Sequence, residues 1–203
     1  MIRVYGILAE SLPTVEAMQE QIGEQWTAAW KARHPSLGGS AARISLGGLY
    51  LLRRSGAEGI LRYTEMGRPF LEGKGIDFSI SHTHDAVFCA VDPSGRGVGL
   101  DAEDLSRLSE NRLEAMAKRW FGETERAHFA KDPSPRTFLS LWTRKEALVK
   151  RTGEGMRQLC LVDTFASCEG RKAAFWTYWR GTTCITLCAE DGECVASDIS
   201  VLT

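Results

Sequence analysis

Two helical patterns, one in each half of the chain, limit the fold more than any other feature of the sequence. Residues 41–54 and 138–150 repeat apolar side chains at helical spacing, and each pattern has strand-like segments on both sides. Because helices and strands are mixed in this way between turn-rich segments, we expect an α+β fold. The strand-like segments lie at residues 1–8, 77–91, 98–103, 174–179 and 182–188.

A faint internal repeat suggests two related halves. The turn-forming residues 92–97 offer a boundary, so we expect an N-terminal half at residues 1–95 and a C-terminal half at residues 96–203. A cleft between two such halves is a common place for an active site. An offset of 99 residues relates Arg43 to Trp142, Cys89 to Cys188, and Asp92 to Asp191.

The composition excludes several classes of protein. The net charge of −1 argues against a basic protein that coats nucleic acid. No apolar run approaches the about 20 residues that span a bilayer, and residues 1–8 read as an opening strand rather than a signal peptide. The cysteines form no Cys-x-x-Cys pair, so we expect them to be small core residues of a reduced, cytoplasmic protein. They are Cys89, Cys160, Cys168, Cys184, Cys188 and Cys194.

Three further expectations concern local structure. Residues 14–32 predict one helix, since apolar side chains recur at every fourth position. Residues 113–130 also predict a helix, which Gly122 interrupts, and residues 161–163 read as a short strand. The apolar stripe of the first helix consists of Met18, Ile22, Trp26 and Trp30.

Two acidic residues lie at a spacing that suits a metal ion. Asp101 and Glu103 are two residues apart in a predicted strand, so their side chains point to the same face. Two carboxylates held side by side repel unless a cation lies between them, and Mg²⁺ prefers oxygen ligands. The alternative is an ordinary pair of surface acids at the end of a strand.

A third carboxylate and a lysine lie on one face of the second helical pattern. Trp142, Glu146 and Lys150 are four residues apart in turn, so they share that face. The glutamate and the lysine could form a simple surface ion pair. The tryptophan favours a covered position, where a lysine and a carboxylate would suit a site for phosphate and metal.

A short segment after residue 78 adds groups that can bind phosphate. Ser79, Ser81 and His82 offer hydroxyl and imidazole groups to phosphate oxygens. His82 and His84 also form a weak pattern for a transition metal, with no third ligand nearby in the sequence.

Taken in order along the chain, these motifs resemble the 4′-phosphopantetheinyl transferases of the Sfp (surfactin-synthetase-activating) type. The resemblance covers residues 40–155, and Arg68 stands where that family usually has lysine. The matching motifs are Arg43-x-x-Leu46-Gly47, Gly67-Arg68-Pro69, Phe78-Ser79-Ile80-Ser81-His82, Gly99-Leu100-Asp101-Ala102-Glu103 and Trp142-Thr143-x-Lys145-Glu146-Ala147-x-x-Lys150.

The resemblance implies a fold and a set of roles. The two halves would be related by a pseudo-twofold axis, with coenzyme A bound in the cleft between them. Asp101, Glu103 and Glu146 would hold Mg²⁺, or Mn²⁺, against the coenzyme A pyrophosphate, which Lys150 would also contact. The nucleotide end, including its 3′-phosphate, would bind Arg43, Arg68, Ser81 and His82.

The activity that the resemblance implies is transfer of the 4′-phosphopantetheine arm of coenzyme A to a serine of an acyl- or peptidyl-carrier protein. Glu146 would accept the serine proton, with Glu103 as the second choice, and Lys150 would offset charge on the pyrophosphate. The alternatives are a catalytically inactive homologue that binds coenzyme A or a carrier, and a Mg²⁺-dependent nuclease. The lack of a basic surplus speaks against the nuclease.

The expected partner is an apo-carrier protein that binds transiently to a monomer. Carrier domains of this kind are acidic, so a local basic and apolar patch is expected on the enzyme. Residues 118–122, Lys-Arg-Trp-Phe-Gly, fit such a patch. The alternative is that Trp120 and Phe121 belong to the core.

Overall fold

The structure, a computed structural model, describes residues 1–165, 173–190 and 199–201. The chain divides into two compact units, Met1–Arg96 with Cys194–Thr203, and Gly97–Glu193. Each unit combines helices with its own β-sheet, which confirms the α+β class.

The first unit is built on a four-stranded sheet in the order β4-β5-β1-β9. β5 pairs antiparallel with β1 and β4, and the short β9 pairs parallel with β1. The last strand of the chain therefore belongs to the same sheet as the first. The strands are β1 (Arg3–Leu8), β4 (Asp77–His82), β5 (Ala86–Asp92) and β9 (Ser200–Val201).

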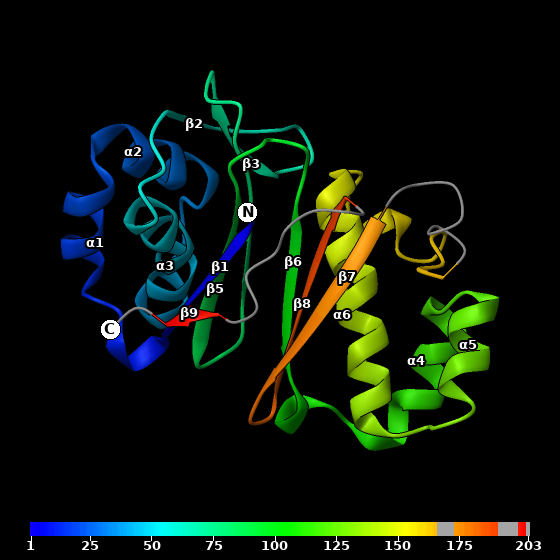
Figure 1. Ribbon diagram of the computed structural model, residues 1–203. Coiled ribbons are helices and arrows are strands. Elements are labelled where there is room, and N and C mark those ends of the chain that lie inside the picture. Colours follow the sequence, from blue (N-terminus) through cyan, green and yellow to red (C-terminus); the bar gives the residue numbers. More distant parts are fainter. Residues whose placement is uncertain (166–172, 191–198, 202–203) are drawn as a thin grey trace. The chain divides into compact units, whose positions relative to one another are not determined.

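Helix α3 lies on one face of this sheet, α1 packs against α3, and α2 packs against α1 (Figure 1). The predicted single helix at residues 14–32 is two helices, because Gly23 adopts φ 86° and breaks it. Its apolar stripe is nevertheless buried, with every member at most 4% exposed. The helices are α1 (Val15–Ile22), α2 (Glu24–Arg33) and α3 (Gly39–Arg54), preceded by a 3-10 turn at Ala9–Ser11.

A hairpin of β2 (Ile60–Tyr63) and β3 (Pro69–Glu72) lies within a segment that the sequence presents only as turn-rich. Its inner residues Leu61 and Leu71 join the core of the first unit. The outer residues Arg62 and Glu72 form an exposed ion pair at 3.2 Å.

The second unit has a three-stranded antiparallel sheet in the order β6-β8-β7, and helix α6 lies along one of its faces (Figure 1). The predicted helix at residues 113–130 breaks at Gly122, as expected. The expected strand at 161–163 is wrong, since these residues follow a 3-10 turn at Met156–Gln158 without strand pairing. The elements are β6 (Gly99–Asp104), α4 (Leu113–Trp120), α5 (Glu123–Phe129), α6 (Pro135–Thr152), β7 (Ala173–Arg180) and β8 (Thr183–Glu190), with 3-10 turns at Leu105–Arg107 and Glu110–Arg112.

Strong end signals fix helix α6, which supplies half of the candidate site. The Ser134 side chain accepts a hydrogen bond from the Thr137 amide at 3.2 Å, and Pro135 occupies the first turn. Gly153 ends the helix in the left-handed conformation, φ 72°. These caps hold all 18 residues of the helix in one register.

The two units repeat one topology. In each, a strand leads through helices to a hairpin whose second strand pairs with the first strand, so that β1, β4 and β5 correspond to β6, β7 and β8. β6 begins 96 residues after β1, at residue 99 against 3, and α6 begins 96 residues after α3, at 135 against 39. The strand pairing therefore gives an offset of 96–97 instead of 99, a shift that short identities such as Cys89 with Cys188 could not reveal. Asp191, in the third pair of that repeat, lies outside the described residues.

The cysteines only partly follow their predicted role. Cys89, Cys184 and Cys188 are buried, as expected, whereas Cys160 is exposed beside the 3-10 turn that follows α6. Cys168 and Cys194 lie outside the described residues.

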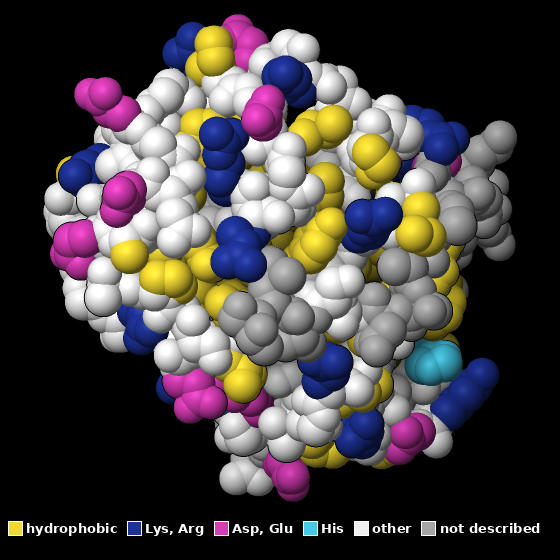
Figure 2. All heavy atoms as spheres, turned by 60° about the vertical axis from the view of Figure 1, so that its left-hand side comes forward, with side chains coloured by type: hydrophobic (Ala, Val, Ile, Leu, Met, Phe, Trp, Pro, Cys, Tyr) yellow, Lys and Arg dark blue, Asp and Glu magenta, His cyan; other side chains and the backbone are white. Residues whose placement is uncertain are grey.

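Surface charge and helix hydropathy agree with the composition. Figure 2 shows lysine and arginine side chains interspersed with acidic ones over the face it draws, in line with the net charge of −1. Within the described part of the chain, no helix combines the length and the apolar character that crossing a membrane requires.

A tight contact between α3 and β4 gives a test of the packing in the first unit. A Cβ atom on Gly48 would lie 2.3 Å from Cγ2 of Ile80, a stiff, β-branched side chain. We expect Gly48→Ala to lower the free energy of unfolding by about 1–3 kcal/mol despite the better helix propensity of alanine. In an Ile80→Ala background the same substitution should be neutral or stabilising. Urea unfolding of the four proteins measures the coupling, and equal effects in both backgrounds would contradict this packing.

Candidate active site

Strand β6 places two carboxylates on the face that meets helix α6. Asp101 and Glu103 alternate with Leu100 and Ala102, which are at most 2% exposed on the opposite face. Asp101 is buried and Glu103 is half-buried. The predicted shared face of the two acids is therefore present.

Helix α6 brings the third carboxylate and the lysine to the same place. One carboxylate oxygen from each of Asp101, Glu103 and Glu146 lies within 4.8 Å of the other two. The Lys150 ammonium donates to Oδ1 of Asp101 at 2.6 Å, and Trp142 makes a side-chain hydrogen bond to Glu103. All of these groups belong to the second unit.

Burial and neighbouring charge change the proton affinity of two of the three acids. Burial, with the neighbouring Asp101 carboxylate adding to it, raises the pKa of Glu103 to about 7. Burial also raises the pKa of Glu146 to about 8, and the charges of Asp101 and Glu103 contribute in the same direction. Lys150 opposes both shifts without cancelling them. The cluster therefore lacks positive charge.

The donor set of this cluster fits a hard divalent cation. Three carboxylate oxygens from a strand and a facing helix converge within the span of one coordination shell, and Mg²⁺ and Mn²⁺ prefer such ligands. A bound cation would replace the repulsion that raises the two pKa values with attraction. Asp101, Glu103 and Glu146 are thus suited to hold the metal that the motif implies.

A fully buried ion pair in the same unit was not foreseen from the sequence. The Lys145 ammonium donates to Oε2 of Glu125 at 2.6 Å, with both side chains fully buried, and it also donates to the Val162 carbonyl. Glu125 further accepts from the amides of Gly122 at 2.7 Å and Thr164 at 2.9 Å. Lys145 therefore ties α6 to α5 and to the segment after α6, while its neighbour Glu146 joins the acidic cluster. No pattern links residues 125 and 145, which lie on different helices.

The residues expected at the nucleotide end lie in the first unit. Ser81 and His82 end strand β4, where Ser81 is buried and His82 is exposed. Arg68 pairs with Asp77 at 2.6 Å, at the beginning of the same strand. β4 thus carries Ser81 and His82, and its first residue, Asp77, holds Arg68.

Arg43 already has a structural task. Its Nε donates to the Pro13 carbonyl at 3.0 Å, and its Nη2 donates to the carbonyls of Glu10, at 3.3 Å, and Leu12. These bonds fasten the segment before α1 to helix α3. Binding of a 3′-phosphate by Arg43 would require an exchange of some of these carbonyl contacts for phosphate oxygens.

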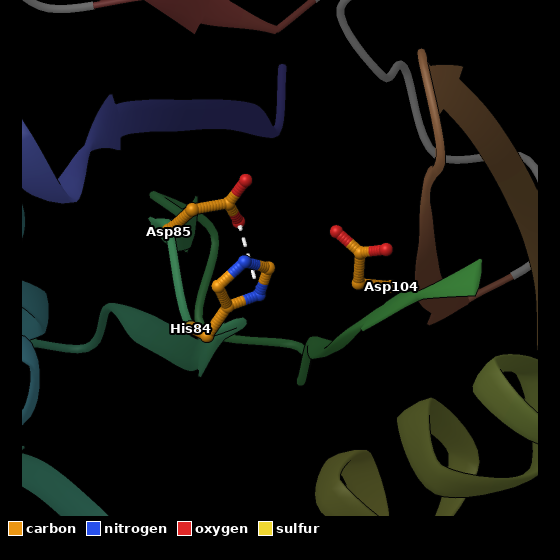
Figure 3. Close-up of side chains that lie close together, drawn as sticks. All are labelled: His84, Asp85 and Asp104. Carbon is orange, nitrogen blue, oxygen red and sulfur yellow. Dashed lines mark ion pairs between the residues drawn. The ribbon is translucent and has the colours of Figure 1, made fainter. Parts of the chain in front are cut away.

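The histidine that follows β4, His84, has an acidic neighbour. Nδ1 of His84 lies 3.7 Å from Oδ1 of Asp85 in the turn between β4 and β5, and both side chains are about half exposed (Figure 3). Asp104, also drawn there, ends β6 and accepts from the Ser106 amide at 2.7 Å. The pattern of His82 and His84 stays a weak prediction for a transition metal.

The expected docking segment is divided between core and surface. Phe121 is 3% exposed and packs with Phe129 and Phe138, so for this residue the core alternative is correct. Trp120 is half-buried with its ring edge-on to Trp142, and the Arg119 guanidinium lies 4.9 Å from the Trp120 ring centre. Lys118 and Arg119 remain as the exposed basic residues of the segment.

The raised pKa values predict how the metal-free stability depends on pH. Glu103 and Glu146 bind protons more tightly in the folded than in the unfolded chain, so the free energy of unfolding falls as pH rises from about 4.5 through 7–8. We expect Glu146→Gln to raise the melting temperature at pH 8, by about 2–4 °C per kcal/mol of repulsion removed, and to leave it nearly unchanged at pH 5. Calorimetry of metal-free protein between pH 5 and 8.5 measures this. Parallel pH profiles for both proteins would contradict the crowding of charge.

Residues 97–196 match the family model of the 4′-phosphopantetheinyl transferase superfamily. The chain is 35% identical to 4′-phosphopantetheinyl transferase HetI of Nostoc sp. over 104 residues, which cover 48% of this chain and 43% of that protein. It is 36% identical to 4′-phosphopantetheinyl transferase gsp of Aneurinibacillus migulanus over 48% of this chain and 39% of that protein, and 39% identical to Sfp of Bacillus subtilis over 39% and 34%.

These alignments span less than half of the relatives' own length. A solved holo-[acyl-carrier-protein] synthase of Thermotoga maritima aligns with 48% of this chain and 64% of its own, at 19% identity and a TM-score of 0.36. The matched family segment contains all three acids and Lys150. Residues 97–196 therefore form a domain of the 4′-phosphopantetheinyl transferase superfamily, which confirms the resemblance drawn from the motifs.

Proposed function

We propose that this chain transfers the 4′-phosphopantetheine arm of coenzyme A to a serine of an apo-carrier protein. The observation that carries the proposal is the convergence of Asp101, Glu103 and Glu146 within 4.8 Å, with Lys150 bonded to Asp101. A protein that only binds coenzyme A would gain nothing from holding three carboxylates together, since their repulsion weakens the metal-free fold. A nuclease is disfavoured by the absence of a basic surplus.

The three carboxylates would hold Mg²⁺, with Mn²⁺ as a substitute, beside the pyrophosphate of coenzyme A. When bound, the cation would neutralise charge that develops on the pyrophosphate oxygens. Lys150 lies at the same cluster and would add a second positive charge to the pyrophosphate. Its side chain is 28% exposed, so it can reach beyond Asp101 to a ligand.

The reaction needs a group that takes the proton of the serine. The serine oxygen would attack the phosphorus that bears the pantetheine arm, and the bond from that phosphorus to the leaving adenosine 3′,5′-bisphosphate would break. Glu146 would accept the serine proton, with Glu103 as the second candidate. A bound cation would keep both carboxylates deprotonated near neutral pH, so that either one could accept the proton.

The nucleotide end of coenzyme A would bind residues of the first unit. Arg68, Ser81 and His82 offer charge and hydrogen bonds along strand β4, and Arg43 would give up carbonyl contacts for the 3′-phosphate. The two units would then hold the two ends of one ligand. The cleft, the pseudo-twofold axis, the monomeric state and the cytoplasmic location belong to this same proposal.

Transfer of the arm to a panel of apo-carriers tests the function directly. The chain is incubated with coenzyme A, Mg²⁺ and apo-carriers from fatty-acid, polyketide and peptide synthesis, and each carrier is weighed by mass spectrometry for the gain of the arm. We expect Asp101→Ala and Glu146→Ala to lower the transfer rate by at least about 100-fold, because each removes a metal ligand. Circular dichroism should show both variants folded.

A matched variant separates the site from the general loss of an acid. Glu123→Ala removes an exposed carboxylate from helix α5 of the same unit and should leave the rate unchanged. Wild-type turnover of either site variant would show that the site is wrongly assigned. A wild-type chain that binds coenzyme A and carrier but transfers nothing would favour the inactive homologue.

A second prediction concerns the carrier, whose acidic surface would meet Lys118 and Arg119. We expect Arg119→Glu to weaken binding of apo-carrier about 10-fold at low salt, mainly through slower association. Lys131→Glu makes the same change in charge at another exposed position of the unit and should have a smaller effect. Surface plasmon resonance measures both. Equal carrier affinity for wild type and Arg119→Glu would exclude this segment from docking.

A further inference from the structure

The closest approach between strand β6 and helix α6 occurs at Gly99. A Cβ atom at this position would lie 1.9 Å from the Ala147 carbonyl oxygen and 2.6 Å from the Arg151 amide nitrogen. Those two atoms are the acceptor and the donor of one step of the α-helical hydrogen-bond ladder. A side chain at residue 99 would therefore collide with the helix backbone, which cannot rotate away as a side chain can.

Residues on either side of Gly99 in the sequence also contact helix α6. Arg151 donates from Nε to the Gly97 carbonyl at 3.3 Å, before Gly99. After it, Asp101 accepts from Lys150 at 2.6 Å and shares a hydrogen bond with Glu146. Positions 99, 101 and 103 share one face of β6, since alternate residues of a strand do. The glycine is thus the place where the two backbones touch, one strand step before the first carboxylate.

We propose that Gly99 is a positioning residue of the metal centre, because only a residue without a side chain lets α6 approach β6 closely enough for Glu146 and Lys150 to meet Asp101. The inference rests on the proposed metal site and goes beyond it, since Gly99 offers no ligand atom. A methyl group here would push the helix outward at Ala147, the residue next to Glu146. The third carboxylate would then leave the shared coordination distance.

The usual effect of replacing glycine by alanine makes this proposal easy to contradict. In the middle of a strand, alanine is ordinarily the more stabilising residue, and Gly99 has no left-handed backbone that would forbid a side chain. If a side chain at residue 99 did not collide with helix α6, Gly99→Ala should stabilise the protein and leave its metal affinity unchanged. With that collision, the variant should lose both stability and metal affinity.

Binding of Mn²⁺ to the full chain, followed by electron paramagnetic resonance of the free ion at low temperature, tests the inference without any catalysis. We expect Gly99→Ala to raise the Mn²⁺ dissociation constant by at least about 10-fold, the range found when supporting groups of a metal site are lost. Gly38→Ala is the matched control, because a Cβ there meets nothing within 4 Å and its φ is −138°. It should bind Mn²⁺ as the wild type does.

A second control separates loss of position from loss of stability. Leu113→Ala opens a cavity in the core of the same unit, in helix α4, and should lower stability without moving β6 or α6. Where Gly99→Ala is only partly folded, the rise in its thermal midpoint on adding Mn²⁺ is measured instead, since that rise reports affinity for the folded state. We expect the full rise for Leu113→Ala and little rise for Gly99→Ala.

The outcomes distinguish the inference from the function on which it rests. Failure of the wild-type chain to bind Mn²⁺ would contradict the proposed metal centre itself. Binding by the wild type together with equal affinity, or an equal thermal rise, for Gly99→Ala overturns the role of the glycine and leaves the metal centre in place.

Discussion

The contact of helix α6 with strand β6 is the constraint on which the candidate site depends. Four groups lie along this contact: the backbone of Gly99, the carboxylate of Asp101, and the carboxylate of Glu146 and the ammonium of Lys150 from the helix. None of them would form a site if the helix stood one side chain further from the strand. The caps at Ser134 and Gly153 fix the register of the helix, and the buried pair of Lys145 with Glu125 holds its other side. The close packing of α6 against β6 is therefore what brings the candidate metal ligands together.

The acidic cluster lowers the stability of the metal-free protein, and other contacts of helix α6 have to compensate for it. Burial first, and then the charges of the neighbouring carboxylates, raise the pKa values of Glu103 and Glu146 towards neutrality, so keeping these groups ionised costs free energy in the folded state. The Lys145 pair shows a different balance, because Glu125 receives an ammonium and two backbone amides and so keeps its hydrogen bonds satisfied in a dry interior. Adjacent residues of α6 thus carry opposite tasks. Lys145 ties three segments of the unit together, whereas Glu146 lowers the free energy of unfolding of the metal-free unit and supplies a ligand for a cation.

The sequence predicts those features of the fold and the site that depend on residues close together in the chain. The period of two in Gly99–Asp104 and the spacing of Trp142, Glu146 and Lys150 are local, so the faces of β6 and α6 were predictable. The break at Gly23, the hairpin of β2 and β3, and the partner of Lys145 depend on the conformation of a glycine or on residues far along the chain. Arg43 shows the limit of a motif, since a residue expected at a phosphate binds three backbone carbonyls in the structure. A matching motif predicts which residue type stands at a position, whereas the contacts of that residue depend on how the chain packs around it.

The repeated topology sharpens this point. With the offset of 96 residues that relates β1 to β6 and α3 to α6, the positions of Asp101, Glu103 and Glu146 correspond to Tyr5, Ile7 and Tyr50 in the first unit. Lys150 corresponds to Arg54, which donates to the Tyr50 hydroxyl at 2.8 Å and so keeps the spacing of a base and its partner on the helix without any acid. The helix packing differs between the units as well, since α3 lies mainly against β4 and β5, whereas α6 lies mainly against β6 and β8. The repeated topology alone therefore does not create the metal centre. Among the described residues, it is the second unit that combines three carboxylates with a helix packed closely against their strand at Gly99.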